Sequence, residues 1–281
     1  MTTFQAIIYS IIHGLTEFLP VGVTAHHILL PYLLGWPAPS GAFDAALSLG
    51  AFLALFVYFR HDWASIISSF LQVLIYRKRP MTIDERLPLF MAVASVPMVI
   101  VWYLLQGIDT PLFSDPLWIA GSMSVFGLFL WYADSRSRKS KGMFDLNWLD
   151  SLAIGVGDLL MFVPGAGRTL GALSSSMLRN YNREIAAKFT FYMAAPLLAA
   201  ITWVRMREVN FHLAAPMLNM TWLSFGLAVV VTFLSSLLAI AGLMKHLAQR
   251  RNFKGYILYR YLVTGLVFLV AWLRYKGYLS A

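Results

Sequence analysis

The chain has 281 residues, no cysteine and a formal net charge of +9, and 59% of its residues are hydrophobic against 12% charged. This composition excludes an ordinary soluble domain, in which about a quarter of the residues are charged. The absence of cysteine excludes disulfides, thiolate nucleophiles and thiolate metal sites. We therefore expect an all-α polytopic membrane protein. No charged segment or cleavage pattern precedes the first apolar stretch, so no signal peptide is expected.

The first unusual segment, residues 13–26, reads His-Gly-Leu-Thr-Glu-Phe-Leu-Pro-Val-Gly-Val-Thr-Ala-His. It places Glu17 and His26 among apolar residues and helix breakers. Ionisable groups at membrane depth are costly and usually functional. The interruptions favour a re-entrant helical hairpin over a span, and such irregular backbone is tolerated only where protein or a water-filled cavity surrounds it.

Six later segments are apolar and long enough to cross a bilayer, which takes roughly 20 residues. They are residues 43–59, 87–105, 117–132, 189–204, 222–244 and 256–272. The segment 63–76 is shorter and has polar interruptions, so it is predicted to be an interfacial helix.

Basic residues gather between the apolar segments, at 77–79, 136–141, 179–188 and 245–254. This is the positive-inside distribution, which predicts cytoplasmic basic loops and termini on the outer face. Arg205 is assigned to an outer end and Arg260 to a cytoplasmic end. The distribution excludes a nucleic-acid partner and indicates a multi-pass membrane protein in contact with membrane lipids.

A second interrupted segment, residues 161–169, reads Met-Phe-Val-Pro-Gly-Ala-Gly-Arg-Thr, and its Phe-Val-Pro echoes Phe18-Leu-Pro20. Each half of the chain has one interrupted segment followed by three spans. This pattern predicts an inverted repeat with a buried site where the repeats meet. The expected boundaries are 1–134 for the first repeat, 135–146 for a cytoplasmic linker and 147–281 for the second repeat.

The hairpins carry the candidate chemistry. Glu17 needs a compensating cation or ligand, and Arg168 is its obvious complement. Arg168 follows a Gly-rich turn and opens a predicted helix that continues through Leu178, a position where backbone amides bind anions. The arginine fork also matches phosphate oxygens. A purely structural ion pair between Glu17 and Arg168 is the alternative.

Three histidines accompany them. His26 and His27 are adjacent and cannot share one helix face, and we favour His26 as the residue that reaches the site. Imidazole suits general acid or base catalysis, or direct attack on phosphorus. His13 lies four residues before Glu17 on the same helix face, where it can orient the carboxylate, ligate a metal beside it or satisfy its charge.

At these residues the chain resembles the undecaprenyl-pyrophosphate phosphatase family of integral membrane proteins. Residues 14–20, Gly-Leu-Thr-Glu-Phe-Leu-Pro, followed by Thr24 and His26, are similar to its first signature, Glu-Gly-Leu-Thr-Glu-Phe-Leu-Pro-Val-Ser-Ser-Thr-Gly-His. Residues 164–169, Pro-Gly-Ala-Gly-Arg-Thr, are similar to its second, Pro-Gly-Phe-Ser-Arg-Ser-Gly. The span pattern matches over essentially the whole chain.

The resemblance implies two re-entrant hairpins that meet in an inverted repeat. It also implies an enzyme of the bacterial inner (cytoplasmic) membrane that removes a phosphate from a polyprenyl diphosphate and so recycles the lipid carrier of cell-wall peptidoglycan synthesis. Glu17, His26 and Arg168 match the second glutamate, the histidine and the arginine of the signatures. Six positions depart from the family: His13 replaces the first glutamate, Gly22-Val23 the serine pair, Gly167 the serine before the arginine, and Ser48 and Asp158 two glutamines.

These departures leave the mechanism open. In a hydrolase, His26 would attack phosphorus or activate water, while Arg168 stabilises phosphoryl charge. Glu17 would orient the histidine or bind Mg²⁺ or Ca²⁺. The other expected phosphate-binding positions are Thr24, Gly165, Gly167 and Thr169, with the two threonines as substitute hydroxyls and with His13, Asp158 and Ser48 as auxiliary residues.

The rival interpretation is a flippase, transporter or binding protein for a lipid-linked phosphate, since inverted repeats are common in transporters. Phosphoryl transfer to an acceptor other than water is a third. The expected partner is a lipid-linked phosphate or diphosphate. The oligomeric state, a homo-oligomer included, stays open.

Overall fold

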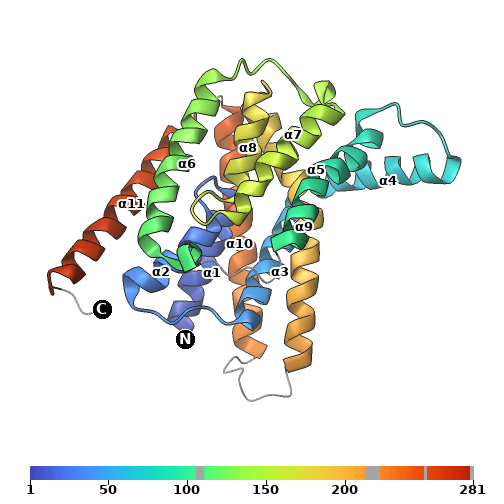
Figure 1. The fold of residues 1–281 in the computed structure, drawn as a ribbon. Coiled ribbons are helices and arrows are strands. Elements are labelled where there is room, and N and C mark those ends of the chain that lie inside the picture. The colour runs from blue at the N-terminus through green and yellow to red at the C-terminus, as the bar shows by residue number, and fades with distance from the viewer. Residues whose placement is uncertain (106–110, 213–221, 250–251, 279–281) are drawn as a thin grey trace.

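A computed structural model describes residues 1–105, 111–212, 222–249 and 252–278, and helices make up its regular structure (Figure 1). The α-helices are α1 (Thr3–Phe18), α2 (Val23–Leu34), α3 (Gly41–Tyr58), α4 (Arg60–Tyr76), α5 (Ile83–Leu105), α6 (Pro116–Arg136), α7 (Trp148–Asp158), α8 (Arg168–Leu178), α9 (Arg183–His212), α10 (Trp222–Ala248) and α11 (Lys254–Tyr275). Short 3₁₀ helices are η1 (Pro111–Ser114), η2 (Met143–Asp145) and η3 (Leu159–Phe162).

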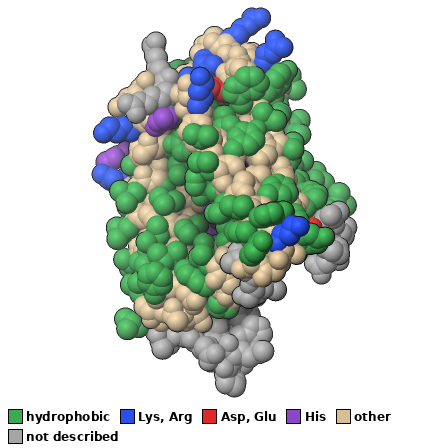
Figure 2. All heavy atoms as spheres, turned by 90° about the vertical axis from the view of Figure 1, so that its left-hand side faces the viewer, with side chains coloured by type: hydrophobic (Ala, Val, Ile, Leu, Met, Phe, Trp, Pro, Cys, Tyr) green, Lys and Arg blue, Asp and Glu red, His purple; other side chains and the backbone are tan. Residues whose placement is uncertain are grey.

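Six helices in the described residues are long and apolar enough to cross a membrane, namely α3, α5, α6, α9, α10 and α11. They coincide with the six predicted spans, so the prediction of an all-α polytopic membrane protein is confirmed. Figure 2 shows one consequence: hydrophobic side chains cover the middle of the face over α6 and α11, and most of the Lys and Arg visible there lie in its upper part.

Two helical hairpins fill the centre of the bundle. The first is α1–α2 and the second is α7–η3–α8, and their turns lie side by side (Figure 1). α1 ends where Leu19 adopts an extended conformation, and Gly22, at φ 91°, redirects the chain into α2. The second turn uses positive φ at Gly165 and Gly167. Each reversal depends on glycine because other residues rarely adopt such backbone angles.

The two halves follow the same order of elements. A hairpin comes first and three spans follow: α3, α5 and α6 in the first half, α9, α10 and α11 in the second. The first half also contains α4, the helix predicted to lie at the interface. The inversion of one half relative to the other, the domain boundaries and the interfacial position of α4 stay predictions.

A buried carboxylate anchors the start of the second hairpin. Asp150, which is fully buried in α7, accepts hydrogen bonds from Lys141 at 2.8 Å, from the Tyr181 hydroxyl at 2.7 Å and from Arg179. Burial alone would raise the pKa of the Asp150 carboxyl, but the three donors outweigh it and hold the pKa below its usual value. The cluster thus joins the segment before α7 to the end of α8.

Replacing Asp150 with asparagine is expected to lower the free energy of unfolding at pH 7 by about 3 kcal/mol, because Lys141 and Arg179 lose their buried partner. The carboxyl pKa is depressed on folding, so its contribution is present above the unfolded pKa of about 3.9 and is lost as the pH falls through the folded value. Thermal unfolding in detergent from pH 7 to pH 3 checks this. The difference in stability between wild type and variant should narrow as the pH falls below about 4, whereas a constant difference would contradict it. Glu184→Gln, at an exposed position, is the control.

Candidate active site

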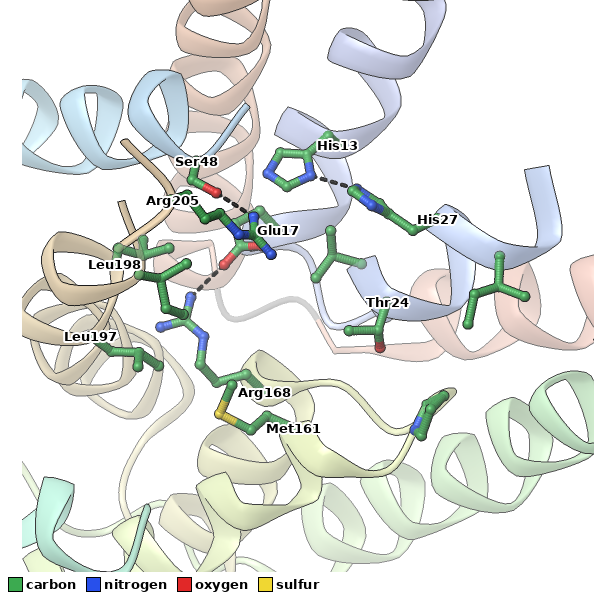
Figure 3. Close-up of a pocket in the computed structure, with 14 residues that line it drawn as sticks. His13, Glu17, Thr24, His27, Ser48, Met161, Arg168, Leu197, Leu198 and Arg205 are labelled. Carbon is green, nitrogen blue, oxygen red and sulfur yellow. Dashed lines mark hydrogen bonds and ion pairs between the residues drawn. The ribbon is translucent and has the colours of Figure 1, made fainter. Parts of the chain in front are cut away.

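A cavity of about 350 Å³ lies between the two hairpins, α3 and α9 (Figure 3). Part of its lining is apolar and includes Leu197, Leu198 and Ile201 from α9. The polar part of the lining comes from side chains of five helices. These are His13, Glu17, Thr24, His27, Ser48, Arg168 and Arg205.

Glu17 and Arg168 face each other across this cavity. Arg168 Nη2 donates to Glu17 Oε1 at 2.8 Å, and both side chains are about nine-tenths buried. Thr169 ties the same two hairpins together, since its hydroxyl donates to the Glu17 carbonyl at 2.9 Å. The structure therefore brings together the pair that the sequence analysis singled out. Arg168 Nη1 is buried and has no hydrogen-bond partner in the described structure, so the guanidinium keeps a free donor.

The histidines are arranged differently from the expectation. His27 lines the cavity, and its Nε2 lies 2.7 Å from Nδ1 of His13 (Figure 3). His26 does not line it. Its Nδ1 bonds the Gly22 carbonyl and its Nε2 the Tyr259 hydroxyl, each at 2.7 Å. A carbonyl only accepts, so Nδ1 carries the proton and Nε2 accepts from Tyr259. Both ring nitrogens of His26 are thus occupied.

The remaining candidates divide into two groups. Thr24 and Ser48 line the cavity, whereas Gly165, Gly167 and Thr169 shape the turn behind it. α8 begins at Arg168 and ends at Leu178, as predicted, with Gly167 as its N-cap. Asp158 is buried and close enough for its charge to interact with those of Glu17 and Arg168, but it does not line the cavity.

Arg205 is a site residue that the sequence analysis missed, because it was assigned to an outer end of a span. Its Nη1 donates to Ser48 Oγ at 2.5 Å and to the Asp44 carbonyl at 3.3 Å. One signal could have found it. Leu198, Ile201 and Arg205 have the i, i+3, i+7 spacing of one helix face, and all three line the cavity.

Arg260 is a second missed residue. It was placed at a cytoplasmic end, but the structure buries it completely behind the hairpin turns. Its guanidinium donates to the carbonyls of Pro20 at 3.4 Å and Ala166 at 3.3 Å, and also to that of Gly165. Its Nε donates to Met123 on α6 at 2.9 Å. Arg260 therefore links both hairpin turns to each other and to its own helix, α11.

Comparison with known proteins places this geometry in a family. The family model described as Bacitracin resistance protein BacA matches residues 6–267. The undecaprenyl-diphosphatase of Moorella thermoacetica is 34% identical over 98% of this chain and 100% of its own length. That of Gemmatimonas aurantiaca is 35% identical over 95% of this chain and 97% of its own length. The chain belongs to the BacA family.

Two departures from the signatures of the BacA family meet at one point. A Cβ added to Gly167 would lie 2.8 Å from Cα of Gly22, closer than real Cβ atoms approach. Both glycines also have positive φ. The close contact between the two hairpin turns therefore depends on the absence of a side chain at Gly167, whereas a Cβ at Gly22 would come no closer than 3.4 Å to the Gly165 carbonyl oxygen. This contact accompanies the loss of the signature serines at these positions.

We expect Gly167→Ala to lower both stability and phosphate release, because the methyl group clashes with Gly22 backbone and φ 85° is unfavourable for alanine. A loss of about 2 kcal/mol is expected. Thermal unfolding and phosphate release in detergent measure it. Gly255→Ala is the control, since a Cβ there meets nothing within 4 Å. Equal behaviour of the two variants would contradict the close packing of the turns.

The donors at the site do not fit a resident divalent cation. Mg²⁺ and Ca²⁺ prefer several oxygen ligands, but among the described residues that line the cavity Glu17 is the one carboxylate, and it is paired with Arg168. Within the described ranges no group of three His, Asp or Glu side chains could hold a metal. A cation carried in by a diphosphate would find Glu17 as its carboxylate contact in the cavity.

Proposed function

We infer that this chain is a membrane hydrolase that removes one phosphate from undecaprenyl diphosphate and so recycles the lipid carrier of cell-wall synthesis. Its relatives carry the name undecaprenyl-diphosphatase. The observation that carries the inference to this chain is the buried Nη1 of Arg168, which has no hydrogen-bond partner in the described structure and belongs to a residue that lines the cavity. A buried guanidinium donor without a partner is costly, and a phosphate oxygen supplies the missing acceptor.

Two arginines suit a substrate with two phosphates. Arg168 reaches the cavity from α8 and Arg205 from α9, and Figure 3 shows both guanidinium groups turned toward Glu17. Diphosphate brings negative charge on both phosphorus centres, and guanidinium groups bind phosphate oxygens bidentately. We assign Arg168 to one phosphate and Arg205 to the other.

A second cavity offers a path for the lipid chain. It has a volume of about 510 Å³ and lies between α5, η3 and α9, with Met98, Phe162 and Val204 in its apolar lining. It shares Met161, Leu197, Ile201 and Arg205 with the site cavity. A polyprenyl tail can occupy this apolar cavity while its diphosphate lies against the arginines. The substrate class is thus a lipid-linked diphosphate.

The chemistry assigned to the residues is hydrolysis at phosphorus. Arg168 and Arg205 stabilise charge on the equatorial oxygens during transfer, and such stabilisation is the main part of phosphoryl-transfer catalysis. Glu17 orients Arg168. Thr24 is the cavity-lining hydroxyl nearest in sequence to the lost signature serines.

For orientation, we propose that the protein lies in the bacterial inner membrane with its basic loops in the cytoplasm and both termini on the outer face. The positive-inside distribution of Lys and Arg supports this. So does the position of the start of α1 and the end of α11 at the same end of the bundle (Figure 1).

The function is tested by phosphate release from undecaprenyl diphosphate by the purified protein in detergent, with Arg205→Ala beside wild type. Wild type should release inorganic phosphate, and the variant should show a higher KM, because one phosphate loses its cation. Binding of the lipid without phosphate release would favour the flippase or transporter interpretation instead.

A further inference from the structure

We propose that His13 is the catalytic base of this enzyme and that His27 and Asp44 set its protonation, an arrangement that takes the place of the family's first signature glutamate. The proposal rests on the hydrolysis inferred above. Three side chains from three helices form the arrangement: His13 on α1, His27 on α2 and Asp44 on α3. We refer to them as the His–His–Asp relay.

The relay runs from Asp44, in the first turn of α3, to the cavity that His27 and His13 line. His13 Nδ1 lies 2.7 Å from His27 Nε2, and the two rings are 4.9 Å apart. His27 Nδ1 lies 3.7 Å from Asp44 Oδ1, an electrostatic contact slightly longer than a hydrogen bond. Asp44 Oδ1 is buried and has no hydrogen-bond partner in the part of the chain that is described. The His27 ring is thus an ion-pair partner of this carboxylate, and Arg205 also interacts with the carboxylate's charge.

The order of donors and acceptors along the relay follows from the chemistry of its ends. An ionised carboxylate only accepts, so it favours the proton of His27 on Nδ1. A neutral imidazole has one N–H and one lone pair. His27 Nε2 is then an acceptor, and His13 Nδ1–H must donate to it. The proton of His13 is thereby fixed on Nδ1, and its Nε2 carries a lone pair.

His13 Nε2 presents that lone pair to the cavity. His13 lies one helical turn before Glu17 on α1 and lines the same cavity as Ser48. Figure 3 shows the His13 ring bonded to His27 on one side, with Glu17, Ser48 and Arg205 on the other. A base must reach the proton that it abstracts while its other nitrogen is oriented by a third group. His13 meets both conditions, whereas both nitrogens of His26 are already bonded.

The step is a direct hydrolysis. His13 Nε2 takes a proton from a water molecule as the water oxygen bonds to the terminal phosphorus. The bond from that phosphorus to the bridging oxygen breaks, and undecaprenyl phosphate leaves with the bond's electron pair. The imidazolium charge is stabilised through His27 by Asp44, and the proton on His13 then passes to the released phosphate. Atoms and charge balance with water as the sole co-reactant.

The test is steady-state phosphate release by the full chain carrying His13→Ala, His27→Phe or Asp44→Ala. His13→Ala should lower kcat by about 10²–10⁴-fold with KM within twofold of wild type. Added imidazole should restore part of that activity, because it can occupy the vacated space beside His27. His27→Phe should lower kcat at least tenfold without rescue, and its effect should not add to that of Asp44→Ala. His61→Ala, at an exposed position on α4, is the control.

Two outcomes would overturn the relay. One is a His13→Ala protein that keeps kcat within threefold of wild type, or that loses activity without any imidazole rescue. The other is an acid-labile phosphohistidine trapped at position 13, which would make His13 a nucleophile rather than a base. Failure of the underlying function is distinguishable, because wild type itself would then release no phosphate.

Discussion

Arg168→Lys is expected to lower kcat/KM for undecaprenyl diphosphate by about 10²–10³-fold, nearly as much as Arg168→Ala. Arg168 uses Nη2 to bind Glu17 and keeps Nη1 free for substrate. A lysine ammonium is a point charge and cannot fulfil both contacts with the same geometry. Phosphate release at several substrate concentrations, together with thermal unfolding, measures the effect.

Arg168→Lys is a more specific test of phosphate binding than Arg168→Ala. Arg168→Ala leaves the buried Glu17 carboxylate without a partner, which costs about 3–5 kcal/mol and can lower activity through stability alone. Arg168→Lys keeps the charge. Arg138→Lys, at an exposed position, is the control. If the lysine variant at 168 kept most of the activity, Arg168 would only balance the charge of Glu17.

The largest expected loss of stability comes from Arg260→Met. Methionine fills much of the same space but leaves the carbonyls of Pro20, Gly165, Ala166 and Met123 without their donor. Each buried unsatisfied acceptor costs about 1–3 kcal/mol. We expect a loss of at least about 4 kcal/mol and a Tm lower by about 10 °C, with activity lost as the turns separate.

Thermal unfolding in detergent checks this, with Arg138→Met as the matched control. Arg260→Lys should recover little, since an ammonium on a single stem cannot reach carbonyls of both turns. A Tm for Arg260→Met equal to that of wild type would show that the hairpin turns do not depend on Arg260.

The spans were predictable from the sequence because long apolar segments have few alternatives in a membrane protein. The same reasoning identified the hairpins, since Pro20 and the glycines at 165 and 167 interrupt apolar sequence. The pairing of Glu17 with Arg168 also followed, because an intramembrane carboxylate needs a cation. These predictions depend on local composition and on charge, both of which the sequence states directly.

The details of the site were harder to predict. Whether His26 or His27 faces the cavity depends on the rotation of α2 about its axis, which Gly22 sets through a backbone angle that the sequence does not specify. The sequence also does not specify where a long side chain lies in the fold. Arg205 and Arg260 both lie near span ends, but the Arg205 side chain points into the cavity, whereas the Arg260 side chain lies behind the hairpin turns. An arginine within residues 256–272 was nevertheless a signal, because ionisable groups inside spans are rarely placed at random.

The most direct test of the central claim is hydrolysis of undecaprenyl diphosphate by wild type in proteoliposomes made up in ¹⁸O-labelled water, with the products analysed by mass spectrometry. Our account predicts undecaprenyl phosphate without label and inorganic phosphate carrying one ¹⁸O, because water attacks the terminal phosphorus. Arg168→Ala should give neither product above background. Label in the lipid product, or lipid that is bound and moved without being cleaved, would contradict it.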